Sequence, residues 1–163
     1  MRPRTEADLD ACITIASAVH DLDGYPVYGV EDLRGFLTVS DALGIWVAGS
    51  ADRVLGHVAL RRGAQPGRIL EVAAEFLDRA PERLCSVTRL LVAPAARRAG
   101  VGVLLLQRAV DAAAELGRTP VLGVDDGSKA VAFYERCGWR RVERITVRTP
   151  AGHEIDQVVY VAP

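Results

Sequence analysis

One stretch, residues 86–108, constrains the fold of this chain more than any other. It begins with an apolar run that ends at residues 90–92, as is typical of a buried strand. Pro94 suits the end of that strand, because proline cannot donate a hydrogen bond to a sheet ladder. Residues 97–102 then carry two arginines and two glycines, and an apolar run with helical spacing follows at once. The stretch therefore predicts a strand, a tight basic turn and a helix.

A turn of this kind is suited to binding an anion. The start of a helix presents unpaired N–H groups and a partial positive charge, and glycines let a ligand approach the backbone closely. The combination most often binds phosphate. The alternative is a glycine turn with surface arginines and no ligand. The physical argument alone predicts a phosphate-bearing ligand and does not identify it.

Two common phosphate motifs fit this stretch poorly. A P-loop needs Lys and then Ser or Thr after its last glycine, whereas Val103 and Leu104 follow Gly102. A dinucleotide-binding motif needs a third glycine where this chain has Leu105. Membership of another class of nucleotide-binding α/β proteins is therefore the weaker alternative.

The stretch resembles motif A of the GNAT acetyltransferase superfamily, which reads Arg/Gln-x-x-Gly-x-Gly/Ala after an apolar strand and a proline. Here it stands as Arg97-Arg98-Ala99-Gly100-Val101-Gly102. Ala99 occupies a position where many members carry Gly or Lys. Because the family's contact there is made by the backbone N–H, we expect alanine to be tolerated.

Residues 130–139 resemble motif B of the same superfamily, Asn-x-x-Ala-x-x-Phe-Tyr-x-x-x-Gly-Phe. Four positions match, and tryptophan replaces the last Phe; these residues are Ala130, Phe133, Tyr134, Gly138 and Trp139. The motif's Asn falls on Gly127, which has no side chain to hold a cofactor. Ser128 or Lys129 could substitute, although Lys129 could equally be a solvated helix residue. The two motifs together cover residues 86–142 well.

The order of elements predicts an α/β (α+β) fold. The expected strands are 1–4, 44–49, 54–62, 84–92, 121–124, 139–148 and 153–161, and the expected helices are 5–20, 31–37, 69–77, 102–116 and 128–136. A Thr5-x-x-Asp8 capping box is expected to begin the first helix. The resemblance implies a single GNAT-like domain over residues 1–163. It also implies a mixed, largely antiparallel twisted sheet with helices on both faces and a splayed central strand pair.

The resemblance implies acetyl-CoA as cosubstrate and no metal. The pantetheine arm would bond the strand backbone at Leu90 and Val92, and N–H groups from Arg98 to Val103 would hold the pyrophosphate. The full set of cofactor-binding residues expected on this basis is Leu90, Leu91, Val92, Arg97, Arg98, Ala99, Gly100, Val101, Gly102, Val103, Ser128, Lys129, Phe133 and Tyr134.

Direct acetyl transfer to an amine needs a base, an oxyanion donor and an acid for the departing thiolate. By resemblance, Tyr134 is the acid and the Val92 backbone N–H is the oxyanion donor; the alternative for Tyr134 is a core aromatic. Many relatives carry a Glu on the central strand, and none stands here. His57 is a weak base candidate. It could instead be a hydrogen-bonded structural histidine, and a water chain would need no residue.

The acceptor amine is expected against the loop and short helix of residues 21–37. Tyr25, Tyr28 and Glu31 are the candidate contacts there, because aromatic and acidic groups suit a cationic amine. The alternative is an ordinary solvated loop. The sequence does not separate a small-molecule amine from a peptide amine.

Composition limits the remaining functions. A net charge of −1 gives no support to nucleic-acid binding. The three cysteines are far apart, lack metal-ligand spacing, and are expected to be buried thiols in a reducing compartment. No apolar run is long enough for a signal peptide or a membrane span, so we expect a cytoplasmic protein without a membrane partner. The C-terminal strands could pair two copies into a homodimer.

The sequence thus predicts an acetyl-CoA-dependent N-acetyltransferase acting on a primary amine of a small molecule or peptide. The alternative function is that of a binding protein: a catalytically weak sensor module of the same fold that binds CoA or acyl-CoA. The missing strand carboxylate and the missing motif B Asn leave that alternative open.

Overall fold

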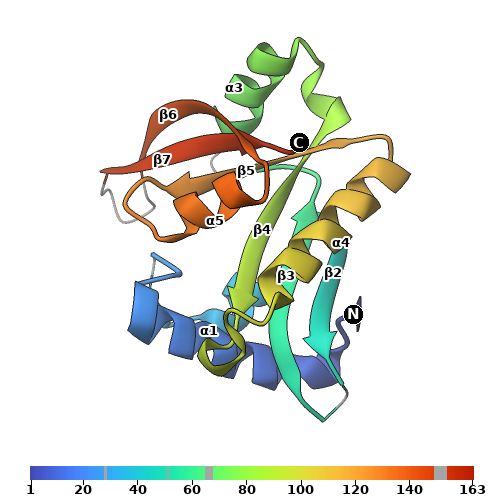
Figure 1. Ribbon diagram of the computed structural model, residues 1–163, viewed down its shortest axis with the longest axis vertical. Coiled ribbons are helices and arrows are strands. Elements are labelled where there is room, and N and C mark those ends of the chain that lie inside the picture. Colours follow the sequence, from blue (N-terminus) through green and yellow to red (C-terminus); the bar gives the residue numbers. More distant parts are fainter. Residues whose placement is uncertain (28, 51, 65–67, 149–153) are drawn as a thin grey trace. The chain divides into compact units, whose positions relative to one another are not determined.

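A computed structural model describes residues 1–27, 29–50, 52–64, 68–148 and 154–163 (Figure 1). The strands follow one another in the sheet as β1-β2-β3-β4-β5-β7-β6. In chain order the elements are β1 (Arg2–Pro3), η1 (Glu6–Asp8), α1 (Leu9–Asp23), α2 (Leu33–Leu37), β2 (Ala42–Gly49), β3 (Val54–Arg61), α3 (Arg68–Leu77), η2 (Pro81–Arg83), β4 (Leu84–Val92), η3 (Pro94–Ala96), α4 (Val101–Glu115), β5 (Thr119–Asp125), α5 (Ala130–Arg136), β6 (Arg140–Arg148) and β7 (Glu154–Val161). This order confirms the α/β prediction. The expected turn at residues 149–152 lies outside the described residues.

The sheet is mixed and largely antiparallel. Strand β2 pairs antiparallel with β1 and with β3, and β7 pairs antiparallel with β5 and with β6. The parallel pair is β4 with β5, and its described ladder joins only Leu84–Ser86 to Thr119–Val121. Since β4 continues to Val92 and β5 to Asp125, the described pairing ends early in both strands, as expected for a splayed central pair.

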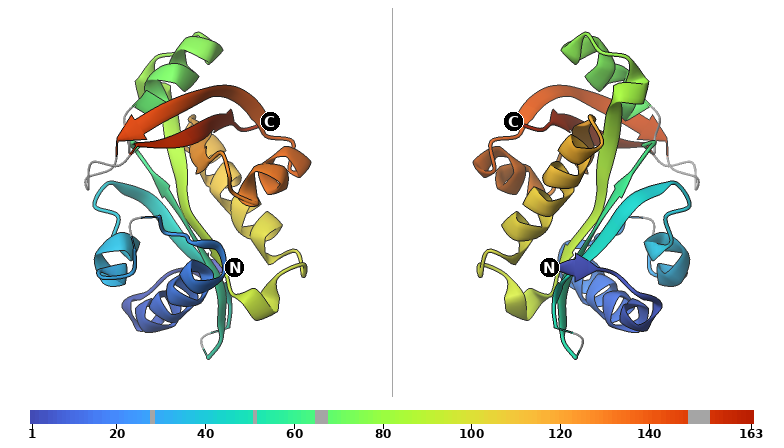
Figure 2. Two further views of the ribbon diagram at one scale, coloured as in Figure 1. Left: turned by 90° about the vertical axis from the view of Figure 1, so that its left-hand side faces the viewer. Right: turned by 90° about the vertical axis from the view of Figure 1, so that its right-hand side faces the viewer.

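The chain divides into two compact units, and the first comprises residues 1–61 and 87–112. Helices cover both faces of its strands (Figure 2). The core on the α1 and α2 side consists of Leu9, Cys12, Ile15, Ala16, Val19, Leu33, Leu37, Val47 and Leu91. On the other face α4 packs against Gly56, where an added Cβ would lie 2.8 Å from Leu105 Cδ1 and 2.6 Å from the Leu91 carbonyl oxygen. Glycine is therefore required for this close packing of helix on strand.

The second unit comprises residues 62–86 and 113–163. Helix α3 packs on its strands through a core of Ile69, Val72, Ala73, Ala74, Leu84, Val121, Ile145, Val147, Val159 and Val161. Tyr160 lies between Val159 and Val161 on β7 and therefore faces the opposite side of the sheet. There it packs against Tyr134 of α5, with 6.2 Å between the ring centroids. The prediction of helices on both faces thus holds within each unit.

Most predicted elements are confirmed with small shifts at their ends: α1 continues to Asp23 rather than residue 20, and β5 spans Thr119–Asp125 rather than 121–124. Helix α2 begins at Leu33 rather than Glu31, because Asp32 caps it by accepting the Gly35 N–H at 2.7 Å. Helix α5 begins at Ala130 rather than Ser128, whose Oγ accepts the Ala130 N–H at 3.1 Å. The assignment of all 163 residues to one domain stays a prediction.

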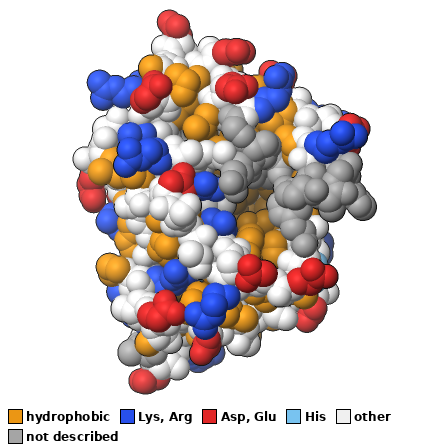
Figure 3. Space-filling model, turned by 180° about the vertical axis from the view of Figure 1, so that it is seen from behind, with side chains coloured by type: hydrophobic (Ala, Val, Ile, Leu, Met, Phe, Trp, Pro, Cys, Tyr) orange, Lys and Arg blue, Asp and Glu red, His pale blue; other side chains and the backbone are white. Residues whose placement is uncertain are grey.

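The surface and the cysteines fit an ordinary globular protein. On the face shown in Figure 3, acidic and basic side chains are interspersed, in keeping with the net charge of −1. Across the described ranges, no helix has the length and apolarity needed to cross a bilayer. Burial raises the pKa of Cys12 to about 11 and that of Cys85 to about 12. Cys137 was expected to be buried and is instead partly exposed.

Candidate functional site

The basic turn predicted from the sequence leads into α4 and contains two residues in the left-handed backbone conformation. Arg98 and Gly100 have φ values of 63° and 80°. The Leu104 N–H then donates to the Gly100 carbonyl oxygen at 3.0 Å, which forms the first turn of the helix. The N–H groups of Val101, Gly102 and Val103 therefore precede the intrahelical ladder, and no carbonyl within α4 can accept them. The helix start can bind an anion through these three groups.

The space beside Gly100 is open. A Cβ built at Gly100 would meet no other heavy atom within 4 Å. Val103, one turn along the helix, is 50% exposed although it is apolar. A ligand can therefore reach the backbone of this turn without displacing a side chain at Gly100.

Arg97 is tied to the end of α1. Its Nη2 lies 2.5 Å from Oδ2 of Asp23, and both side chains are partly buried. The sequence analysis assigned Arg97 to the cofactor and did not foresee this partner, because the two residues are 74 positions apart. The ion pair positions the basic turn and partly neutralises Arg97.

Strand β4 contains one residue in a conformation that strands do not normally adopt. Arg89 has a φ of 53°, in the left-handed region that is costly for a residue with a side chain. Beyond it Leu91 is buried, whereas Leu90 and Val92 are only partly buried. The Ala93 N–H donates to the Leu55 carbonyl oxygen at 2.9 Å, which joins the end of β4 to β3.

His57 on β3 holds this conformation from inside the protein. It is fully buried, and its Nδ1 lies 2.9 Å from the Arg89 carbonyl oxygen. Because a carbonyl only accepts, Nδ1 carries the hydrogen, and Nε2 faces Nη1 of Arg4 at 3.5 Å. Burial lowers the pKa of His57 to about 4. The sequence left two alternatives for His57, a general base and a structural histidine, and the geometry favours the structural histidine.

The guanidinium of Arg89 packs on an aromatic ring and has two nitrogens that no described residue pairs. Its Cζ lies 5.1 Å from the centre of the Phe36 ring, while Nε and Nη1 are buried without a hydrogen-bond partner among the described residues. Burial lowers the pKa of this guanidinium from its ordinary value. The sequence predicted only that this strand carries no Glu, and it assigned no role to Arg89. An arginine within the apolar run of residues 87–92 was the available signal.

The three predicted acceptor residues have different outcomes. Tyr25 packs edge-on against Phe36, with 5.8 Å between the ring centroids, and so lies near Arg89. Glu31 is exposed before α2. Tyr28 lies outside the described residues. In the same region, Nδ1 of His20 lies 3.0 Å from the Pro26 carbonyl oxygen.

Motif B forms an aromatic cluster in the second unit. Tyr134 is 9% exposed, and its ring centroid lies 5.3 Å from that of Phe133 and 5.9 Å from that of Trp139. This packing is compatible both with the proposed acid and with a core aromatic. Ser128, expected as a cofactor contact, accepts the Ala130 N–H through its Oγ, and Lys129 is the N-cap residue of α5.

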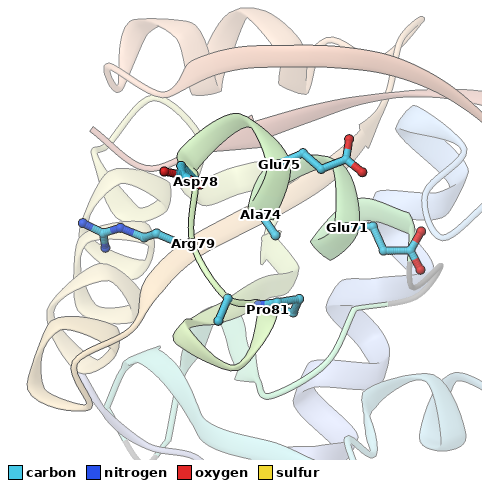
Figure 4. Close-up of a pocket in the computed structure, with 7 residues that line it drawn as sticks. Glu71, Ala74, Glu75, Asp78, Arg79 and Pro81 are labelled. Carbon is cyan, nitrogen blue, oxygen red and sulfur yellow. The ribbon is translucent and has the colours of Figure 1, made fainter.

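A separate open pocket lies beside α3 (Figure 4). It has a volume of about 410 Å³ and is lined by Glu71, Ala74, Glu75, Asp78, Arg79, Ala80 and Pro81. In this view Arg79 points away from Glu71 and Glu75, and its Nη1 donates to Thr119 Oγ1 at 2.8 Å. The lining groups do not converge on a common point. Nor do any three His, Cys, Asp or Glu side chains in the described part of the chain form a metal-binding group.

Comparison with known proteins identifies a family for this chain. Residues 11–139 match the sequence model of the Acetyltransferase (GNAT) family. No curated protein matches the chain.

Solved structures share the fold at low sequence identity. A ribosomal-protein-alanine N-acetyltransferase from Brucella melitensis is 22% identical, with a TM-score of 0.66 over 98% of this chain and 96% of that chain. Arabidopsis thaliana NAA60 in complex with acetyl-CoA is 20% identical, with a TM-score of 0.69 over 98% and 95%. An N-acetyltransferase from Staphylococcus aureus Mu50 is also 20% identical, with a TM-score of 0.69 over 98% and 94%.

Proposed function

Because this chain belongs to the acetyltransferase (GNAT) family, we propose that it transfers an acetyl group from acetyl-CoA directly to a primary amine. The observation that carries the proposal is the open, left-handed turn at Gly100 at the start of α4. This turn lies within the matched residues 11–139 and bears the motif that binds phosphate in the family.

The cofactor would be held mainly by the backbone. The N–H groups at the start of α4 would bind the pyrophosphate, where the helix dipole also favours negative charge. Leu90 and Val92 would bond the pantetheine arm as a neighbouring strand does. The Arabidopsis NAA60 structure contains acetyl-CoA, which supports this choice of cosubstrate.

The chemistry would proceed by direct attack. The deprotonated amine attacks the thioester carbonyl carbon, and the Val92 N–H stabilises the oxyanion that forms. The carbon–sulfur bond then breaks, and Tyr134 gives its proton to the leaving thiolate. The roles of Val92 and Tyr134 rest on the resemblance to the family motifs.

Strand β4 supplies no general base in the form many relatives have. Ser86 donates through Oγ to the Gly63 carbonyl oxygen, and the remaining polar residues of β4 are Thr88 and Arg89. His57 is neutral and buried, so we assign it a positioning role beneath Arg89. Water would therefore remove the ammonium proton of the acceptor.

The first test is thermal unfolding with acetyl-CoA, NAD and ATP in parallel. A ligand at about 100 times its dissociation constant stabilises the folded state by roughly 2.7 kcal/mol, which raises the midpoint by several degrees. We expect this rise with acetyl-CoA alone. Protection by NAD or ATP but not by acetyl-CoA would contradict the assignment. Protection without turnover of any amine would support the sensor alternative.

A further inference from the structure

We infer that the acceptor carries a carboxylate close to its amine, and that Arg89 binds this carboxylate; the inference rests on the acetyl transfer proposed above. It concerns the choice of acceptor, which the family leaves open. It favours free amino acids and other small amino carboxylates over the amino terminus of a peptide, which has an amide at the corresponding position.

Arg89 has two buried donor nitrogens without a hydrogen-bond partner among the described residues. A buried charged donor without an acceptor is costly, so such donors are normally paired. Arg89 leaves both Nε and Nη1 buried and without a hydrogen-bond partner in the described ranges. Each of these nitrogens can donate to an anionic oxygen, and carboxylates are common partners of the planar arginine donors.

The second argument is the charge around Arg89. The titratable groups that act electrostatically on its guanidinium are Tyr25, Arg61, Asp41 and Arg4. Asp41 is already engaged by Arg61, with 2.8 Å between Nη2 and Oδ1. Three arginines therefore face one carboxylate, and an anionic ligand would relieve this excess.

The third argument is the position of Arg89. It lies three residues before Val92 on β4, a distance of about 10 Å along a strand. At this separation, a carboxylate bound by Arg89 can belong to the same small molecule as the attacking amine. Phe36 and Tyr25 on the same side would contact the apolar part of that molecule.

The fourth argument is the backbone at Arg89. Its φ of 53° is costly, and His57 supports it by donating Nδ1–H to its carbonyl oxygen. Such a residue persists where the surrounding structure demands it. Here the conformation aims the side chain toward Phe36 on the acceptor side of the first unit.

The test compares matched acceptors with the purified full-length protein. Each amino acid is assayed beside its amide and its decarboxylated amine, and an ω-amino acid series beside the n-alkylamines determines the preferred spacing. Dipeptides form a further arm. Thiol release gives kcat/KM for each acceptor. We expect a preference of about 100-fold or more for the carboxylate over its amide, since a buried charged donor would otherwise stay unpaired.

Variants then assign the preference to Arg89. We expect Arg89→Met, similar in length and uncharged, to lose most of the preference, and Arg89→Lys, which keeps the charge, to retain part of it. The control is Arg34→Met on the neighbouring helix α2, where the guanidinium is exposed and pairs with Glu6 and Asp10. It should keep the full preference. The shift of the unfolding midpoint by acetyl-CoA checks that each variant is folded.

The outcomes separate this inference from the proposed function. Equal turnover of acids and amides by the wild type, or an unchanged preference in folded Arg89→Met, would overturn the inference and leave acetyl transfer intact. Turnover confined to dipeptides or amides would do the same. Failure to acetylate any amine would overturn the proposed function and the inference with it. If both Arg89 variants fail to fold, the wild-type preference alone decides.

Discussion

His57 and Arg89 are joined across β3 and β4 by a hydrogen bond of 2.9 Å between Nδ1 and the carbonyl oxygen. The bond fixes the histidine as the Nδ1–H tautomer and holds the one left-handed residue of β4. A residue that titrates near neutrality in water is thereby buried in its neutral form. The histidine thus supports the β4 backbone at Arg89.

This burial predicts a stability that depends on pH. The pKa of His57 is about 4 in the folded protein and near 6.5 when unfolded, so between these values the unfolded state binds more protons. Stability therefore falls as pH falls through this window, by about 2 kcal/mol between pH 7 and pH 5. Urea unfolding at both pH values measures the effect.

The matched variant for the pH experiment is His57→Asn. It should be less stable than the wild type at pH 7, because the hydrogen bond to Arg89 is altered. Between pH 7 and pH 5 it should lose about 2 kcal/mol less than the wild type. The same pH dependence in both proteins would show that His57 is not the group responsible.

Gly100 predicts the effect of a negative charge at the phosphate site. We expect Gly100→Glu to abolish acetyl-CoA binding, because its carboxylate would occupy the space where the pyrophosphate is placed. Gly117→Glu is the control, since Gly117 also has a positive φ, of 64°, and an open Cβ position. Both substitutions place a side chain at a positive φ. Calorimetric titration with acetyl-CoA should show binding by the control alone, and equal affinities would contradict the motif A assignment.

Tyr134 predicts a separation of turnover from binding. We expect Tyr134→Phe to lower kcat by about 100-fold or more, the usual contribution of a general acid, with little change in acetyl-CoA affinity. Tyr160→Phe is the control, because Tyr160 lies beside Tyr134 and its hydroxyl donates to Glu135 Oε1 at 2.9 Å. Equal turnover by wild type and Tyr134→Phe would leave Tyr134 as a core aromatic.

Asp8 predicts a contribution to stability at the start of α1. It is 3% exposed, accepts two hydrogen bonds from Arg2, and accepts the Thr5 N–H at 2.7 Å, as the expected capping box requires. The bonds from Arg2 hold the pKa of Asp8 well below its usual range. We expect Asp8→Ala to lower the unfolding midpoint by several degrees.

Asp10→Ala is the control for Asp8. Asp10 pairs with Arg34 at 3.1 Å, but its side chain is 89% exposed, and exposed ion pairs contribute little. Its midpoint should stay close to that of the wild type. Equal losses in the two variants would mean that burial of Asp8 is not what matters.

The sequence predicted local elements well because their signals are local. Residues 84–92 were expected as a strand from their apolar run, and β4 has these bounds. Gly100 was expected at an open turn, and it has a positive φ there. Two helices, α2 and α5, begin two residues later than predicted. Asp32 and Ser128 accept backbone N–H groups at these helix starts, and in the sequence such residues look like members of the first helical turn.

The cluster of Arg4, His57 and Arg89 could not be predicted in the same way. Its members are 53 and 32 positions apart, and only the register between strands brings them together. The left-handed φ of Arg89 has no signal in residue type, since arginine does not favour it. The Asp23–Arg97 pair was missed for the same reason of distance along the chain.

The most direct test of the central claim is acetyl transfer by the purified protein with acetyl-CoA and a panel of primary amines. Free thiol and acetylated amine are measured together, and the Gly100→Glu variant serves as the inactive control. Our account predicts one acetylated amine for each thiol released by the wild type, and neither product from the variant. Thiol release without acetylated amine, or equal activity of the variant, would contradict it.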